Sequence, residues 1–172
     1  GGAQRAEQAE ACVNDSDPNP PAFRLRVYLD TSVVSALHDA RTPERLAQTI
    51  AFWARLPALD ACTSALTLDE IADTPDASRR RDMERSAAEV RQFEVDTAMR
   101  GLAERYIRAQ IFATTQRADA LHVAAATLGR ADVLVSWNFR HLVNRRRRAL
   151  VNALNVSIGA SSIDIISPPE LQ

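Results

Sequence analysis

Short runs of β-branched and aromatic residues alternate along this chain with longer stretches whose apolar residues recur at helical spacing. Arg26–Asp30 and Asp132–Val135 are typical of buried strands, whereas the segments 43–53 and 118–128 have helical periodicity. Parallel strands need long crossover connections, usually helices, and a parallel sheet is buried on both faces. The chain is therefore predicted to be α/β, with helices on both faces of a central, mostly parallel sheet, giving three α/β/α layers.

Further elements are predicted from the same patterns. Leu59–Thr63 and Ile163–Ile166 are expected to be strands, the second at an edge of the sheet. Asp76 to about Phe93 is predicted to be one charged, exposed helix. A short helix is predicted around Asn138–Val143, followed by a basic helix over 145–154.

The length of 172 residues predicts one domain, assigned to residues 24–172. Residues 1–23 are polar and proline-rich without apolar periodicity, so they are predicted to be a disordered tail. No apolar run approaches the roughly 20 residues of a membrane span, and the first residues do not resemble a secretion signal. A cytoplasmic location is expected. Cys12 and Cys62 are the only cysteines and lack CxxC spacing, which argues against a disulfide or a zinc site.

The formal net charge of −1 does not by itself indicate a nucleic acid partner. All 21 basic residues are arginines, whose planar guanidinium groups suit bidentate contacts with phosphate. They cluster at Arg79–Arg81 and Arg145–Arg148. Both clusters are consistent either with solvated helix faces or with phosphate contacts.

Three acidic residues fall on elements that a parallel α/β sheet would bring together. Asp30 ends the first strand, Glu70 lies on the short helix after the second, and Asp119 is in the first turn of a helix. Each has a local explanation as well: an N-cap, solvated surface and a favourable helix dipole. Gathered in one crevice, however, three carboxylates would repel one another unless a cation neutralised them. Oxygen ligands of this kind favour Mg²⁺ or Mn²⁺.

Four sequence segments resemble the motifs of PIN domains, most closely the toxin-type, VapC-like ribonucleases. They occur in the family's order and on the expected elements, and the resemblance extends from about Arg26 to Leu171. The segments are Tyr28–Ser32, Asp69–Ile71, Arg117–His122 and Leu134–His141.

This resemblance implies a PIN-like fold and endoribonuclease activity that depends on Mg²⁺ or Mn²⁺. The family's catalytic and metal-binding positions carry over to four residues, with two serines in supporting roles. The four are Asp30, Glu70, Asp119 and Asn138, and the two are Ser32 and Ser136. Many PIN nucleases have Asp where this chain has Asn138, so the site here carries one less negative charge. Implied partners are an RNA substrate, a cognate antitoxin and a second copy of the chain.

Other polar and aromatic residues near these motifs have less specific signals. The candidates for binding the RNA backbone are Arg140, Arg145, Arg146, Arg147 and Arg148. His122 is expected to be a packed helix residue, with a hydrogen bond to one of the acids as the alternative. Trp137 and Phe139 are expected in the core or an interface, although either could stack on a base.

Two alternatives to a toxin nuclease remain. The substitution at Asn138 favours a catalytically weak or inactive PIN module that binds RNA or a protein. A phosphotransfer or dehalogenase enzyme would use Asp30 as a nucleophile after a strand. Such enzymes usually need a nearby second acid or a lysine, and this chain contains no lysine.

Overall fold

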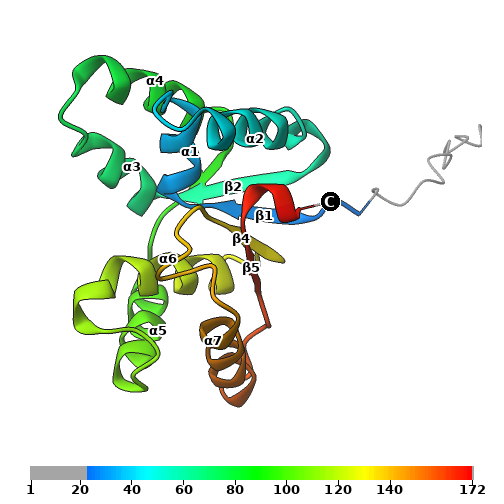
Figure 1. The fold of residues 1–172 in the computed structure, drawn as a ribbon. Helices are drawn as coiled ribbons and strands as arrows, with labels where there is room; N and C mark the ends of the chain where they lie inside the picture. The colour runs from blue at the N-terminus through cyan, green and yellow to red at the C-terminus, as the bar shows by residue number, and fades with distance from the viewer. Residues whose placement is uncertain (1–22, 172) are drawn as a thin grey trace, which may run out of the picture.

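A computed structural model describes residues 23–171, and these form a three-layer α/β/α domain (Figure 1). The five-stranded sheet has the order β3-β2-β1-β4-β5, and all four strand pairings are parallel. The predicted α/β class is confirmed. The predicted tail lies, except for Phe23, outside the described residues. The strands are β1 Arg26–Leu29, β2 Asp60–Ser64, β3 Arg91–Phe93, β4 Val133–Val135 and β5 Asp164–Ile166.

In the described residues, 23–171, seven α-helices cover the two faces of the sheet (Figure 1). One face carries α1 Thr31–Leu37, α2 Pro43–Trp53, α3 Ala65–Ala72 and α4 Ala77–Ala87. The other carries α5 Thr97–Arg108, α6 Arg117–Leu128 and α7 Arg145–Ser157. Short 3₁₀ turns are η1 Leu56–Ala58, η2 Thr114–Gln116 and η3 Pro168–Glu170. Within residues 23–171, no helix has the length and apolar character needed to cross a membrane.

Strand β1 lies at the centre of the sheet, and its alternating side chains divide the core in two. Val27 and Leu29 pack in the cluster that contains Val33 of α1 and Phe52 of α2. Tyr28 points to the opposite face and packs in the cluster formed with α5, α6 and α7. This alternation follows from the two-residue period of a strand. Both faces of β1 are thus buried, which explains its uninterrupted apolar sequence.

The carboxyl ends of the three central strands bring polar residues to one edge of the sheet. Asp30 follows β1, Ser64 ends β2 and Ser136 follows β4. The backbone N–H of Asp30 donates to the carbonyl of Val135 at 3.3 Å, which ties the ends of β1 and β4 together. In an open parallel sheet, this edge is where ligands bind.

Two predicted elements are wrong. The segment 76–93 is not one helix, because α4 ends at Ala87 and Arg91–Phe93 form the edge strand β3. Arg91 and Gln92 are exposed, so the sequence of this strand lacks the apolar alternation by which a strand is predicted. The segment becomes a strand because it pairs with β2 in the folded domain. The segment 138–143 is a turn rather than a helix. Its backbone N–H groups at 142 and 143 both donate to the carbonyl of Asn138 at 2.9 Å.

A buried acid at the end of α1 predicts loss of stability at low pH. Asp39 forms ion pairs with Arg41 at 2.8 Å and Arg45 at 2.9 Å, and Arg79 lies 4.0 Å away. Hydrogen bonds from Arg41 hold the pKa of Asp39 well below its usual range. The stabilisation is therefore complete above the unfolded pKa of about 3.9 and is lost as the pH falls toward the folded pKa. We expect Asp39→Asn to melt below wild type at pH 7, with the gap beginning to narrow only below about pH 3.9 and narrowing further toward the folded pKa. A gap at about pH 2 as large as the gap at pH 7 would contradict this assignment.

Candidate functional site

Asp30 lies between the start of α1 and the loop after β4, and both hold its carboxylate by hydrogen bonds. It is the N-cap of α1, and its Oδ1 accepts from the backbone N–H of Ser32 at 3.1 Å and from the Ser32 hydroxyl at 2.5 Å. Its Oδ2 accepts from the Ser136 hydroxyl at 2.6 Å. The Ser136 hydroxyl also accepts the backbone N–H of Asn138 at 2.9 Å. Asp30 is only 4% exposed, so these contacts fix its carboxylate in one orientation. Capping and a role in the site are compatible here.

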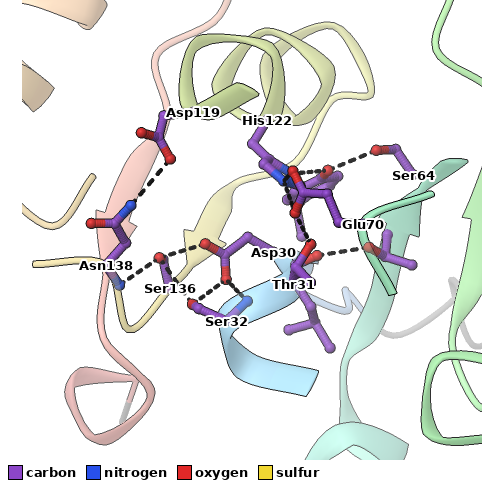
Figure 2. A network of polar contacts seen from close by, with 12 residues as sticks. Asp30, Thr31, Ser32, Ser64, Glu70, Asp119, His122, Ser136 and Asn138 are labelled. Atoms are coloured by element: carbon purple, nitrogen blue, oxygen red, sulfur yellow. Dashed lines mark hydrogen bonds and ion pairs between the residues drawn. The ribbon is translucent and has the colours of Figure 1, made fainter. Parts of the chain in front are cut away.

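Glu70 reaches the same edge of the sheet from α3, where a chain of hydrogen bonds holds it (Figure 2). The Thr31 hydroxyl donates to one Glu70 oxygen, and Nε2 of His122 lies 3.2 and 3.3 Å from the two oxygens. An ionised carboxylate only accepts, so Nε2 carries the proton. Nδ1 of His122 lies 2.8 Å from the Tyr28 hydroxyl, which in turn lies 2.8 Å from the Ser64 hydroxyl. The position of Glu70 therefore depends on β1, β2 and α6.

Asp119 lies in the first turn of α6, opposite the loop that follows β4. Its Oδ1 accepts from the side-chain N–H of Asn138 at 3.1 Å (Figure 2). The carbonyl oxygen of the same amide accepts the backbone N–H of His141 at 3.0 Å. Asn138 thus uses both ends of its side chain, one to hold Asp119 and the other to close the turn.

The acids and His122 act on one another electrostatically. Burial is the main cause that raises the pKa of Asp30 and of Asp119 above the usual aspartate value. Burial would also raise the pKa of Glu70, but the hydrogen bond and charge of His122 outweigh it and lower that pKa. Burial disfavours the imidazolium, yet the pKa of His122 is raised because Glu70, Asp30 and Asp119 all favour its charge. One histidine therefore partly compensates three acids.

Asp30, Glu70 and Asp119 offer carboxylate oxygens, which are the ligands that Mg²⁺ and Mn²⁺ prefer. The donor atoms of the site therefore fit a divalent cation. No arginine forms an ion pair with Asp30, Glu70 or Asp119 in the described part of the chain. Other acids do have arginine partners: Asp39, Asp60, Asp82, Glu104 and Asp164. Within residues 23–171, however, no three His, Cys, Asp or Glu side chains are grouped closely enough to hold an ion. Joint binding of one ion stays a prediction, and it requires rotation of the acids away from their present partners.

The predicted RNA-binding arginines differ in their exposure and in whether their guanidinium groups already have a partner. Arg145, Arg146 and Arg140 are exposed. Arg147 donates to the carbonyl of His141 at 2.5 Å and lies over the Phe112 ring, 4.7 Å from its centroid. Arg148 forms an ion pair with Asp164 at 2.6 Å. Phosphate binding by this cluster stays a prediction, and Arg148 is the member whose charge is already neutralised.

The two aromatic residues beside the site have different environments. Trp137 packs against the core on the α1–α2 face, and its Nε1–H donates to the Thr49 hydroxyl at 3.0 Å. Phe139 is 54% exposed and meets the Trp137 ring edge-on at 6.0 Å. Only Phe139 is free to contact a ligand.

Sequence patterns missed Tyr28, Ser64 and Thr31 as parts of this site. Tyr28 has the pattern of a core strand residue, and it is fully buried. The spacing of His122, one helical turn after Asp119, did indicate that it could contact an acid of the site. In the structure His122 packs in the core and also forms a hydrogen bond with Glu70. A buried tyrosine hydroxyl also needs a partner, which is a general hint that a polar group faces it.

Tyr28→Phe should therefore weaken the site, whereas Tyr106→Phe should not. The Tyr106 hydroxyl is equally buried but donates to Asn155 at 2.6 Å, away from the acids. Each loss leaves buried polar groups unpaired and should cost about 1–3 kcal/mol of stability. Removing a partner that orients a ligand typically costs about 10–100-fold in metal affinity or activity. We expect that loss for Tyr28→Phe alone, measured by Mn²⁺ titration and RNA cleavage. Equal metal affinity in both variants would show that the Tyr28 hydroxyl serves stability only.

Comparison with known proteins defines the class of fold. No family model and no curated protein matches the sequence. Among solved structures, the chain is similar to VapC20 of Mycobacterium tuberculosis, a toxin that cleaves the sarcin–ricin loop. The TM-score is 0.55 at 19% identity, over 67% of this chain and 92% of that one. It is also similar to the VapBC2 structure of Rickettsia felis, bound to a DNA fragment from its promoter. There the TM-score is 0.52 at 9% identity, over 83% of this chain and 98% of that one.

The domain therefore has the VapC-like PIN fold that the four motifs predicted. At these identities the likeness concerns the fold, and the chemistry has to be argued from the site itself.

Proposed function

We propose that this chain is a Mg²⁺- or Mn²⁺-dependent endoribonuclease and the toxin of a toxin–antitoxin pair, acting in the cytoplasm. The observation that carries the proposal is a pair of acids, the buried Asp30 and the half-buried Asp119, which have raised pKa values and form no ion pair with an arginine among the described residues. They lie at the ligand-binding edge of a VapC-like fold. Acids that share one histidine and form no arginine ion pair in such a place favour a bound cation.

In this proposal Asp30, Glu70 and Asp119 hold the ion, with Asn138 as a further oxygen donor. A bound Mg²⁺ or Mn²⁺ supplies Lewis acidity for hydrolysis of a phosphodiester. Ser32 and Ser136 orient the carboxylate of Asp30, as their hydrogen bonds indicate. His122 orients Glu70 in the same way through the bond from Nε2. Neighbours on three different elements thus position the acids at this edge, and the acids have to rotate from these positions to bind one ion jointly.

The experiment is cleavage of a panel of structured RNAs, with a synthetic sarcin–ricin hairpin included because the similar VapC20 cleaves that loop. The panel is incubated with Mg²⁺, with Mn²⁺ and with a chelator. Glu44→Gln removes an exposed carboxylate from the first turn of α2, outside the site. It should cleave like wild type, and it shows that a purified variant of this chain keeps its activity. Cleavage that needs the metal supports the proposal. Cleavage unchanged by the chelator, or none with either metal, contradicts it.

A second function is favoured by the geometry of Asn138. Its amide oxygen accepts the backbone N–H of His141 and its amide nitrogen faces Asp119. In this arrangement the amide oxygen already accepts one hydrogen bond, and the amide nitrogen, which cannot bind a cation, faces the acid. A PIN module that binds RNA or a protein without cleaving it would agree with that geometry. RNA binding without cleavage in the same panel would select this reading.

The partners follow from the same proposal. The VapBC2 structure is of a VapBC system bound to promoter DNA, which supports an antitoxin as partner of this chain. Association of two copies of the chain stays a prediction. Co-expression with the protein encoded beside its gene, followed by light scattering, measures both.

Replacing two exposed arginines should weaken RNA binding and flatten its salt dependence. Each phosphate contact on single-stranded nucleic acid contributes about 0.7 to the slope of log K against log salt. We therefore expect Arg145→Gln/Arg146→Gln to lower the magnitude of that slope by about 1.4. Arg148→Gln is the comparison, because Asp164 already neutralises this arginine and the slope should change less. Unchanged affinity and slope in the double variant would show a solvated helix face.

A further inference from the structure

A cavity of about 360 Å³ opens at the carboxyl ends of β2 and β3, next to the helix segments that carry Glu70 and His122. Its walls come from α3, from the segment after β3, from the first turn of α5 and from α6. The residues that matter are Leu66, Asp69, Glu94, Val95, Arg100 and Leu121. Its volume falls in the range of about 300–1,000 Å³ that is usual for small-ligand sites.

The cavity shares two walls with the proposed nuclease site. Asp69 directly precedes Glu70 on α3, and Leu121 directly precedes His122 on α6. Glu70 and His122 are themselves in contact, with Nε2 3.2 Å from the carboxylate. The cavity therefore lies one residue along α3 and α6 from Glu70 and His122, on the β3 side of the sheet.

The charged residues of the cavity are free to bind something else. Asp69, Glu94 and Arg100 are all exposed, and in the part of the chain that is described none of them takes part in an ion pair. Two carboxylates and one guanidinium give the cavity a formal charge of −1. A phosphate group would be repelled there, whereas a neutral ring with hydrogen-bond donors would not.

We propose that this cavity is a subsite for an unpaired guanine next to the bond that is cut. The proposal rests on the nuclease function proposed above. Guanine has two adjacent donors, N1–H and the N2 amino group, that match a carboxylate, and it has acceptors at O6 and N7 that match an arginine. Apolar side chains such as Leu66 and Leu121 supply walls for a flat ring. Base edges of unpaired RNA are read in this way by proteins.

The test measures base preference around the cleavage site in a library of random short RNAs. A specific base contact of this kind predicts at least about 5-fold preference for guanine at one position flanking the cut. Asp69→Asn/Glu94→Gln should reduce the preference to below about 2-fold, and Arg100→Gln should reduce it as well. Cleavage of the sequences without guanine should stay within about 2-fold of wild type, because the acids of the site are intact.

Matched controls come from the same two helices. Asp73→Asn changes an exposed acid at the end of α3, and Arg105→Gln changes an exposed arginine on α5; neither residue lines the cavity. Both should keep the wild-type preference. A wild-type enzyme with no guanine preference overturns the proposal, and so does a preference that survives in the double variant.

A binding measurement separates failure of the subsite from failure of the nuclease function. Titration with GMP, AMP, CMP and UMP, followed by NMR, needs no cleavage. GMP should bind at least about 5-fold more tightly than the other three, and Asp69→Asn/Glu94→Gln should abolish the difference. If RNA is not cleaved but this selectivity is found, the nuclease proposal fails and the base site stands. Equal binding of the four nucleotides overturns the base site.

Discussion

Asp30→Asn is expected to reduce metal-dependent RNA cleavage at least about 100-fold, equivalent to about 2.7 kcal/mol of transition-state stabilisation. Asparagine is as good an N-cap as aspartate, so the start of α1 should persist. Its amide oxygen can still accept from Ser32, and its N–H groups can face the Ser136 hydroxyl, whose oxygen can accept as well as donate. What the variant removes is the negative charge that an ion requires.

The same substitution should stabilise the metal-free protein. Burial raises the pKa of Asp30, so its ionised form is less favourable in the folded state than in the unfolded chain. At neutral pH this opposes folding, and the opposition is lost as the pH falls and Asp30 becomes protonated. Asp30→Asn should therefore melt above wild type at pH 7, with the difference shrinking toward acidic pH. Scanning calorimetry in the presence of a chelator measures it.

A matched control exists at another helix start. Asp76 caps α4, and its carboxylate accepts from the backbone N–H of Arg79 at 2.8 Å, in the same way that Asp30 caps α1. Asp76→Asn should leave cleavage unchanged. Its stability should not rise, because hydrogen bonds from the backbone lower the pKa of Asp76. Activity near wild type in Asp30→Asn would remove this residue from the site.

Substitutions at Asn138 should change metal affinity in opposite directions. In Asn138→Asp a carboxylate oxygen replaces the N–H that lies 3.1 Å from Asp119, so two acids face each other. Unit charges about 4 Å apart interact with about 4 kcal/mol at an effective dielectric of 20, and a divalent ion doubles that. Repulsion and desolvation offset most of the gain. A net tightening of Mn²⁺ binding by about 10-fold, equivalent to about 1.4 kcal/mol, is expected.

The metal-free form of Asn138→Asp should be less stable than wild type for the same reason. Asn138→Ala removes both hydrogen bonds of the amide and should lower metal affinity and cleavage. Asn144→Asp is the control for added charge, because Asn144 caps α7 on the exposed surface and aspartate caps equally well. Calorimetric titration of the four proteins decides the role of Asn138. If Asp, Asn and Ala at this position bind Mn²⁺ equally, Asn138 is not part of the site.

Local sequence patterns were enough to predict the frame of this domain. The apolar run of β1, the Pro43 start of α2 and the Gly129 end of α6 depend on steric and hydrogen-bonding preferences of neighbouring residues. Such preferences act over a few positions, so they can be read without knowing the fold. Strand–helix alternation then required a parallel sheet, and that sheet placed Asp30 and Ser136 at one edge.

Tertiary structure alone decided which side chains meet at that edge and what they do there. Tyr28 bonds His122 from a distance of 94 positions in the chain, and Asn138 turns its amide nitrogen rather than its oxygen toward Asp119. β3 is a strand because β2 offers it a free edge, although its own residues carry no strand pattern. Each of these outcomes depends on a partner that packing brings close. Such hydrogen bonds join residues far apart in the sequence, so no periodic pattern of residues predicts them. The chain's sequence thus determined its layers and the positions of its acids, whereas packing determined their partners, the directions of their pKa shifts and the cavity beside them.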